Sequence, residues 1–255
     1  MQDLTVSRRQ ALAGLAVIGA TSAGVGLGTR ALFSDTEEFS KNNVTAGELD
    51  LKVAWRKSVT QVETRVETSS EYPTPTNDVD APICELADVK PGDHGVIEFI
   101  FRIDDNPGYV SLLGAEQADE ENGQPEPERG ALSESIPVGR EGELDELINT
   151  TVSYGTIDSD DDVTAATRAY TSSLASLIGL GNVGSGVILD GDGSASVVDI
   201  LLGNATPNAF EPGTKHGLRV EFEVPRTVGN GVQTDRYEFA TGFFGEQARN
   251  NETWT

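Results

Sequence analysis

Residues 218–224 read Leu-Arg-Val-Glu-Phe-Glu-Val, an uninterrupted alternation of apolar and charged side chains. A β-strand turns successive side chains to opposite faces, so this pattern predicts a strand with one buried and one wet face. The same alternation recurs at 49–55, 97–103 and 237–243. One apolar face per strand is typical of antiparallel sheets that pack on one another. These segments together predict an all-β fold, an antiparallel β-sandwich.

Helix signals are few. Residues 141–148 and 172–178 predict two short helices in connections between strands, and the acidic, proline-containing stretch 115–140 predicts a long surface loop. Turn sequences such as Lys-Pro-Gly-Asp at 90–93 separate the strands. The chain has no repeat of 20–50 residues and no linker between two cores, so 44–255 is predicted to form a single sandwich domain.

The charge of the chain limits its partners. Of 255 residues, 42 are acidic and 18 basic, a formal net charge of -24. A nucleic-acid-binding protein needs a basic surface to neutralise phosphates, so that class is excluded. Such acidity with so few lysines indicates a protein that works in concentrated salt, where self-repulsion is screened. An ordinary acidic protein is the alternative.

The N-terminus has the features of an export signal. Two arginines at 8–9 precede an uncharged, alanine- and glycine-rich run at 10–29. This run is short for a membrane anchor and predicts a signal peptide, 1–31, cleaved between Ala31 and Leu32. The protein is therefore expected outside the cell, at the surface or in a secreted matrix. Export by the general or the twin-arginine route, and an uncleaved anchor, remain open.

Catalytic motifs are absent from the sequence, and we expect no enzymatic activity. The only histidines, His94 and His216, each follow a turn signal and are predicted to begin strands rather than bind a metal. Cys84 is the single cysteine, so neither a disulfide within the chain nor a cysteine metal site can form. A buried thiol and an intermolecular disulfide are its two alternatives.

Two acidic clusters are candidate calcium sites, because calcium prefers oxygen ligands at alternate positions. Neither matches the EF-hand pattern, and solvated acidic turns are the alternative. No other cofactor is expected. The candidate ligands are Asp158, Asp160, Asp162, Asp190 and Asp192.

Four Asn-x-Thr sequons are candidate glycosylation sites in an exported protein. They lie at Asn43, Asn149, Asn204 and Asn251.

The segment from Gly26 to Val53 resembles the start of the TasA/camelysin family of secreted proteins, in a form adapted to salt. In that family a signal peptide ends in Gly-x-Ala and precedes an aromatic-Ser-Asp segment and an Ala-Gly-x-Leu-Asp-Leu strand. The matching residues are Gly28, Ala31, Phe33, Ser34, Asp35, Asn43, Ala46, Gly47, Leu49, Asp50 and Leu51. Further similarity occurs at 86–93, 105–109 and 243–251.

The resemblance implies a jelly-roll sandwich that is exported and assembles with itself into filaments of a biofilm matrix. A signal peptidase processes such proteins, and matrix polysaccharide is a further expected partner. In relatives the mature N-terminus serves as a donor strand for the next subunit, which implies that role here for Leu32, Phe33 and Phe39. The metalloprotease activity attributed to camelysin would carry over only together with a metal site.

The arm, residues 32–43, has some of the features that assembly requires. Fully extended, the arm reaches at most roughly 40 Å, enough to cross a neighbour's sheet. Phe33 and Phe39 share one face of an extended strand, but Asp35, Thr36, Glu37 and Glu38 (35–38) break the apolar alternation. An arm that folds back on its own domain is one alternative. A monomeric binding module for polysaccharide or calcium, and a surface protease, are the other functions considered.

Overall fold

The alternating segments become the central strands of two antiparallel sheets in the computed structural model of the chain. The model describes residues 49–61, 63–77, 80–87, 89–120, 144–182, 186–202, 204–228 and 235–248. All of these residues belong to one compact unit, 39–255. The predicted signal peptide, 1–31, and the arm, 32–43, lie outside the described residues.

Most of the described elements of this unit are β-strands, and the described helices are short. In chain order they are β1 (Asp50–Thr60), β2 (Thr64–Thr68), β3 (Ile83–Ala87), β4 (His94–Asp104), β5 (Gly108–Glu120), α3 (Leu144–Leu147), β6 (Asn149–Ile157), β7 (Val163–Ser173), α4 (Leu174–Asn182), β8 (Val187–Ile188), α5 (Val197–Leu201), β9 (Lys215–Glu223) and β10 (Arg236–Gln247).

The strands form two sheets of unequal width. The larger sheet has six strands in the order β2-β1-β4-β9-β6-β7, and the smaller has four in the order β3-β10-β5-β8. Every ladder in the described part of the chain is antiparallel. The predicted all-β sandwich is therefore confirmed, and the four alternating segments form β1, β4, β9 and β10.

One hydrophobic core joins the two sheets. Aromatic rings from facing strands meet edge to face: Phe99 of β4 and Phe243 of β10 have centroids 5.0 Å apart, and Phe222 of β9 and Phe239 of β10 have centroids 5.5 Å apart. All four rings are at most 3% exposed. The apolar face of each strand is thus the face that packs on the opposite sheet, as the alternation predicted.

Three connections differ from the sequence predictions. The helix expected at 141–148 is described only as α3, Leu144–Leu147, and the one expected at 172–178 begins at Leu174 and continues to Asn182. The surface loop expected at 115–140 was wrong for residues 115–120, which continue β5. Their sequence, Ala-Glu-Gln-Ala-Asp-Glu, does not alternate cleanly, but pairing with β10 extends the strand and places Arg236 3.4 Å from Glu120.

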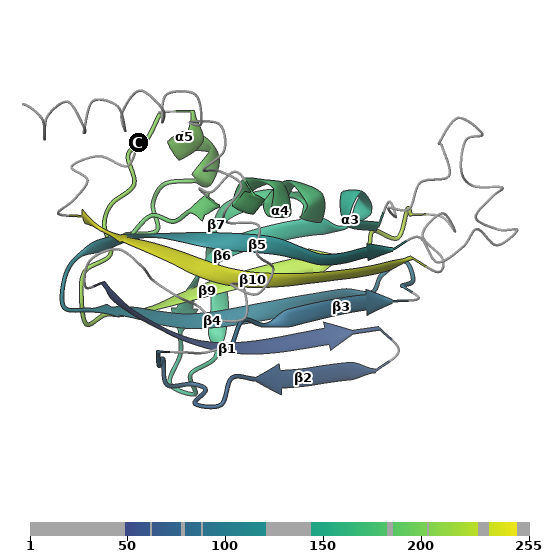
Figure 1. Cartoon of the computed structure of the whole chain (residues 1–255), viewed down its shortest axis with the longest axis horizontal. Helices are drawn as coiled ribbons and strands as arrows, with labels where there is room; N and C mark the ends of the chain where they lie inside the picture. Colours follow the sequence, from purple (N-terminus) through teal and green to yellow (C-terminus); the bar gives the residue numbers. More distant parts are fainter. Residues whose placement is uncertain are drawn as a thin grey trace, which may run out of the picture. The chain divides into compact units, whose positions relative to one another are not determined.

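The two open sides of the sandwich are covered differently. Figure 1 shows α3, α4 and α5 gathered on the side of β5 and β7, and β2 on the opposite side. Helix α4 packs closely on β5, where a Cβ atom at Gly114 would lie 2.7 Å from the Ile178 side chain. In the described part of the chain, no helix covers the side formed by β2 and β3.

Candidate interaction site at the edge of the smaller sheet

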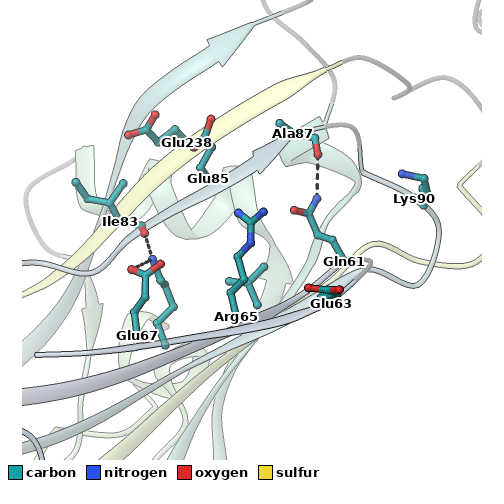
Figure 2. Close-up of a pocket in the computed structure, with 11 residues that line it drawn as sticks. Gln61, Glu63, Arg65, Glu67, Ile83, Glu85, Ala87, Lys90 and Glu238 are labelled. Atoms are coloured by element: carbon teal, nitrogen blue, oxygen red, sulfur yellow. Dashed lines mark hydrogen bonds and ion pairs between the residues drawn. The ribbon is translucent and has the colours of Figure 1, made fainter.

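The uncovered side contains a cleft of about 660 Å³ between β2 and β3. It exists because the larger sheet continues beyond β1 with β2, whereas the smaller sheet ends at β3. Figure 2 shows Arg65 and Glu67 of β2, with Glu63 just before that strand, on one side of this space and Ile83 and Ala87 of β3 on the other. The outer edge of β3 pairs with no strand in the described part of the chain.

Two side chains of the larger sheet cover this edge. The Lys57 ammonium donates a hydrogen bond to the backbone carbonyl of Ile83, and the Gln61 amide donates one to the carbonyl of Ala87 at 3.0 Å. These carbonyls therefore receive side-chain donors in the place where a neighbouring strand would supply N–H groups. Exposed edges in natural proteins are commonly protected by charged side chains, and Lys57 has that position here.

Lys57 is held in place by burial and charge. Its side chain is 8% exposed, and its ammonium lies 2.9 Å from a carboxylate oxygen of Glu67 on β2. Beneath it, Cys84 is fully buried, and desolvation raises the pKa of its thiol to about 12 despite the nearby charge of Lys57. The buried-thiol alternative for Cys84 is confirmed, and a disulfide to another molecule would require the core to open.

Arg65 differs from its neighbours because it has no partner. Its exposed guanidinium projects from β2 toward β3 in Figure 2, and within the described residues it forms no hydrogen bond or ion pair. Many of the other basic side chains described are paired with carboxylates. They include Lys52, Lys57, Arg56, Arg102, Lys215, Arg219 and Arg236.

Two of the other outer strands, β7 and β8, offer less to an added strand. β7 follows β6 with two register irregularities, between Val152 and Ser153 and between Tyr154 and Gly155, and such bulges hinder edge pairing. β8 has only two residues, Val187 and Ile188. β3 has five residues in regular register with β10, and β2, at the edge of the larger sheet, has five in regular register with β1, so both form regular outer edges in the described part of the chain.

The sequence did not point to this cleft. β2 and β3 have five residues each, too short for alternation to stand out, and neither was expected as a strand. The one available signal was Thr-Arg-Val-Glu-Thr at 64–68, which alternates charged and uncharged side chains. Which edge this short strand joins depends on pairing with β1, which a periodicity does not specify.

The first candidate calcium cluster lies in the turn between β6 and β7. The Asp158 carboxylate accepts hydrogen bonds from the backbone N–H groups of Asp160 and Asp162, at 2.9 and 3.0 Å. Asp162 lies 2.6 Å from the guanidinium of Arg56, which already balances its charge. The carboxylates of Asp158 and Asp162 therefore already have partners within the protein. Calcium binding at this turn stays a prediction.

The second cluster surrounds Asp190, which is completely buried. Its two carboxylate oxygens accept hydrogen bonds from Ser194, Ala195 and Asn208, while Asp192 accepts from Ser194 and Asn208. A cation would compete with these donors for the same oxygens. No group of three or more His, Cys, Asp or Glu side chains arranged for a metal occurs in the described ranges.

Two of the four candidate glycosylation sites lie among the described residues. Asn149 begins β6 and Asn204 follows α5, and both are exposed, as glycosylation requires. Asn43 and Asn251 lie outside the described residues, as do Ala31, Leu32, Phe33 and Phe39.

The two histidines lie at the start of strands, as predicted. His94 is the first residue of β4 and His216 the second of β9. The His216 ring stacks on Phe101 with centroids 5.5 Å apart, and burial lowers its pKa.

None of the helices described here is long and apolar enough to span a membrane. No protein-family model matches the chain, and no curated protein or solved structure matches it significantly.

Proposed function

We propose that this chain is an exported structural subunit of extracellular filaments or biofilm matrix. In this proposal, cleavage after Ala31 frees residues 32–43 of one subunit, which add as a donor strand to the sandwich of the next. The sandwich is of jelly-roll type, and the filament is built by subunits of this chain. Its acidic surface suits assembly in concentrated salt.

The observation that carries the proposal is the outer edge of β3, which pairs with no strand in the described part of the chain. Beside it, β2 of the larger sheet borders a cleft of about 660 Å³. An extended peptide that pairs with β3 would complete the sheet and fill the cleft, which is the established mode of β-strand addition.

The start of β1 lies away from the cleft. Leu49, which precedes β1, packs beside Gly108 and Gly245, whereas the cleft lies where β1 ends, at Lys57 and Gln61. The eight residues from Leu49 to Lys57 span about 27 Å of strand. The start of β1 and the cleft therefore lie at opposite ends of that strand. In the proposal, an arm that reaches from one subunit to the sheet edge of the next makes a head-to-tail contact, and such contacts generate open filaments when they do not close into a ring.

Electron microscopy of the purified chain beginning at Leu32, in about 1 M salt, tests this function. We expect filaments from this chain. We expect a folded monomer with unchanged circular dichroism from a variant that lacks residues 32–40. Filaments of normal appearance from that variant would contradict donor-strand assembly.

A binding module for matrix polysaccharide is the second candidate, and the size of the cleft favours it. Ligand pockets occupy about 300–1,000 Å³ and contain a few convergent polar groups. The cleft falls in this range and presents Gln61, Glu63, Arg65 and Glu85. Monomeric protein in the microscope, together with saturable binding of a polysaccharide in calorimetry, would favour this alternative over the filament.

A further inference from the structure

The outer edge of β2 is open to solvent. β2 is the last strand of the larger sheet, and all five of its side chains are exposed. Figure 1 shows it as the outermost strand, beyond β1. Lys57 and Gln61 cover the edge of β3, but no side chain among the described residues covers the backbone of β2 in this way. An open edge of this kind can pair with a strand of another molecule.

The hydrogen bonds of the β1–β2 hairpin determine which backbone groups of β2 face outward. The Ser69 N–H, just after β2, donates to the Trp55 carbonyl of β1 at 2.9 Å. Hydrogen-bonded pairs alternate along an antiparallel ladder, so Arg65 and Glu67 are also bonded to β1. The residues that alternate with them turn their N–H and carbonyl groups away from β1. These residues are Thr64, Val66 and Thr68.

The sequence of β2 is complementary to itself about its central residue. Residues 64–68 read Thr-Arg-Val-Glu-Thr. In an antiparallel pair of two copies with a two-fold axis at Val66, each Arg65 lies opposite Glu67 of the second copy. The two Val66 residues exchange backbone hydrogen bonds through their outward groups. The Arg–Glu pairs then belong to the closer, non-hydrogen-bonded type, with Cα atoms about 4.5 Å apart.

Neighbouring registers bring like charges together. An axis at Arg65 would place the two guanidinium groups opposite each other and Glu63 opposite Glu67 of the second copy. An axis at Glu67 would place two carboxylates opposite each other. Like charges directly opposite destabilise a strand pair, so the charges of β2 favour the register centred on Val66.

Two side chains of β2 gain a partner in that register. Arg65 has no ion pair among the described residues, and Val66 is 59% exposed, which is a large fraction for an apolar side chain. Pairing places a carboxylate beside Arg65 and a second valine beside Val66. One oxygen of Glu67 lies 2.9 Å from the Lys57 ammonium, which leaves the other oxygen for the guanidinium of the second copy.

We propose that β2 is a self-pairing edge through which two copies of this chain associate, antiparallel and centred on Val66. The larger sheets of the two copies become one continuous sheet. The contact is isologous, since the same five residues serve on both sides. This inference goes beyond the proposed function and involves neither the arm nor filament formation.

The contact is weak in dilute solution. Stable interfaces bury about 800 Å² on each partner, more than one short strand pair provides, so association requires concentrated protein. It also requires salt, because two chains of net charge -24 repel one another until their charges are screened. A covalent cross-link traps such a contact.

The two-fold axis is tested by Val66→Cys in the chain beginning at Leu32. Cα atoms of a hydrogen-bonded pair lie about 5.5 Å apart, which a disulfide can span. Mild oxidation in about 1 M sodium chloride should give a covalent dimer on a non-reducing gel, while Cys84 is buried and does not react. Thr167→Cys, exposed on β7 at the other edge of the same sheet, is the control. It should give about tenfold less dimer. Equal yields from both variants would indicate random collision and overturn the proposal.

The register is tested by exchanging charges in the Val66→Cys chain. Arg65→Glu places carboxylates opposite carboxylates, and Glu67→Arg places guanidinium groups opposite guanidinium groups. Each variant alone should form the dimer about tenfold more slowly. A mixture of the two should regain the original rate, because every cation then faces a carboxylate of the other chain. Arg168→Glu, at an exposed and unpaired arginine of β7, should leave the rate unchanged.

Circular dichroism of each variant confirms the fold, and mass spectrometry identifies the product of the mixture as the heterodimer. Rapid cross-linking of both charge variants alone, or slow cross-linking of their folded mixture, would overturn self-pairing of β2. The assay detects a covalent pair and not a filament, so its result is independent of the proposed function.

Discussion

Asp190 and Asn208 are joined by two hydrogen bonds across 18 residues of chain. The backbone N–H and the side-chain amide of Asn208 both donate to one carboxylate oxygen of Asp190, at 2.7 and 3.1 Å. The other oxygen accepts from the backbone N–H groups of Ser194 and Ala195, each at 2.9 Å. A single buried carboxylate thus holds the segment between β8 and α5 against the segment that leads to β9.

Asp190→Ala is expected to lower the free energy of unfolding by about 2–4 kcal/mol, because several buried N–H groups lose their acceptor. Burial alone would raise the pKa of Asp190, but the hydrogen bonds that it accepts from Asn208, Ala195 and Ser194 outweigh burial and lower it. The stabilisation is therefore present above the unfolded pKa of about 3.9 and is lost as the pH falls below it.

Urea unfolding of the unmodified protein and of the Asp190→Ala variant at several pH values measures this effect. Asp160→Ala, at an exposed position of the other acidic turn, is the control and should change stability by less than about 0.5 kcal/mol. An equal loss in both variants would show that the Asp190 hydrogen bonds are not the cause.

Glu98→Gln is expected to destabilise the larger sheet. Glu98 is 7% exposed and lies 2.6 Å from each of Arg56 and Arg219 on the neighbouring strands. Removing the charge leaves two partly buried guanidinium groups without their shared carboxylate, at a cost of about 2–3 kcal/mol. Glu221→Gln removes an exposed partner of Arg219 and should cost less than about 1 kcal/mol. Chemical denaturation of both variants provides the comparison.

Asp145→Asn is expected to stabilise the protein at neutral pH. Burial raises the pKa of Asp145 to about 6, and nearby carboxylates, Asp119 foremost, add to the shift. The folded state thus holds a proton that the unfolded state releases above about pH 4. The stability that the folded protein gains from binding this proton is fully present below about pH 4, and it is lost as the pH rises through about 6.

After allowance for the partial exposure of Asp145, the gain from Asp145→Asn at pH 7 should be about 1 kcal/mol. Thermal unfolding across the pH range measures it, and the gain should vanish below about pH 4. A gain that persists in acid would exclude the carboxylate charge as its cause.

Screening of charge is expected to stabilise the fold. At a net charge of -24 the compact state carries strong self-repulsion, which salt reduces as the Debye length falls from about 10 Å at 0.1 M to about 3 Å at 1 M. The unfolding temperature should therefore rise steeply with sodium chloride and then level off. A rise that is linear and unsaturated, and equal to that with sucrose, would indicate solute exclusion instead.

Long, regular strands were predictable from the sequence because periodicity is a local property. In 218–224 each side chain faces the side of the sheet that its polarity requires, whatever the neighbouring strands are. The same holds for β1, β4 and β10. Residues 115–120 were not predictable in this way, since their strand conformation depends on pairing with β10, more than a hundred residues later.

The sequence by itself determined the fold class, the acidic surface, the strands with one buried face and the candidate arm. Only the tertiary structure decided that β3 is the last described strand of the smaller sheet, that Lys57 and Gln61 cover its edge, and that Arg65 lines the cleft with no ion pair among the described residues. The physical reason is that a free edge is defined by the strand that does not pair there. No property of five residues in isolation specifies which neighbour a sheet lacks.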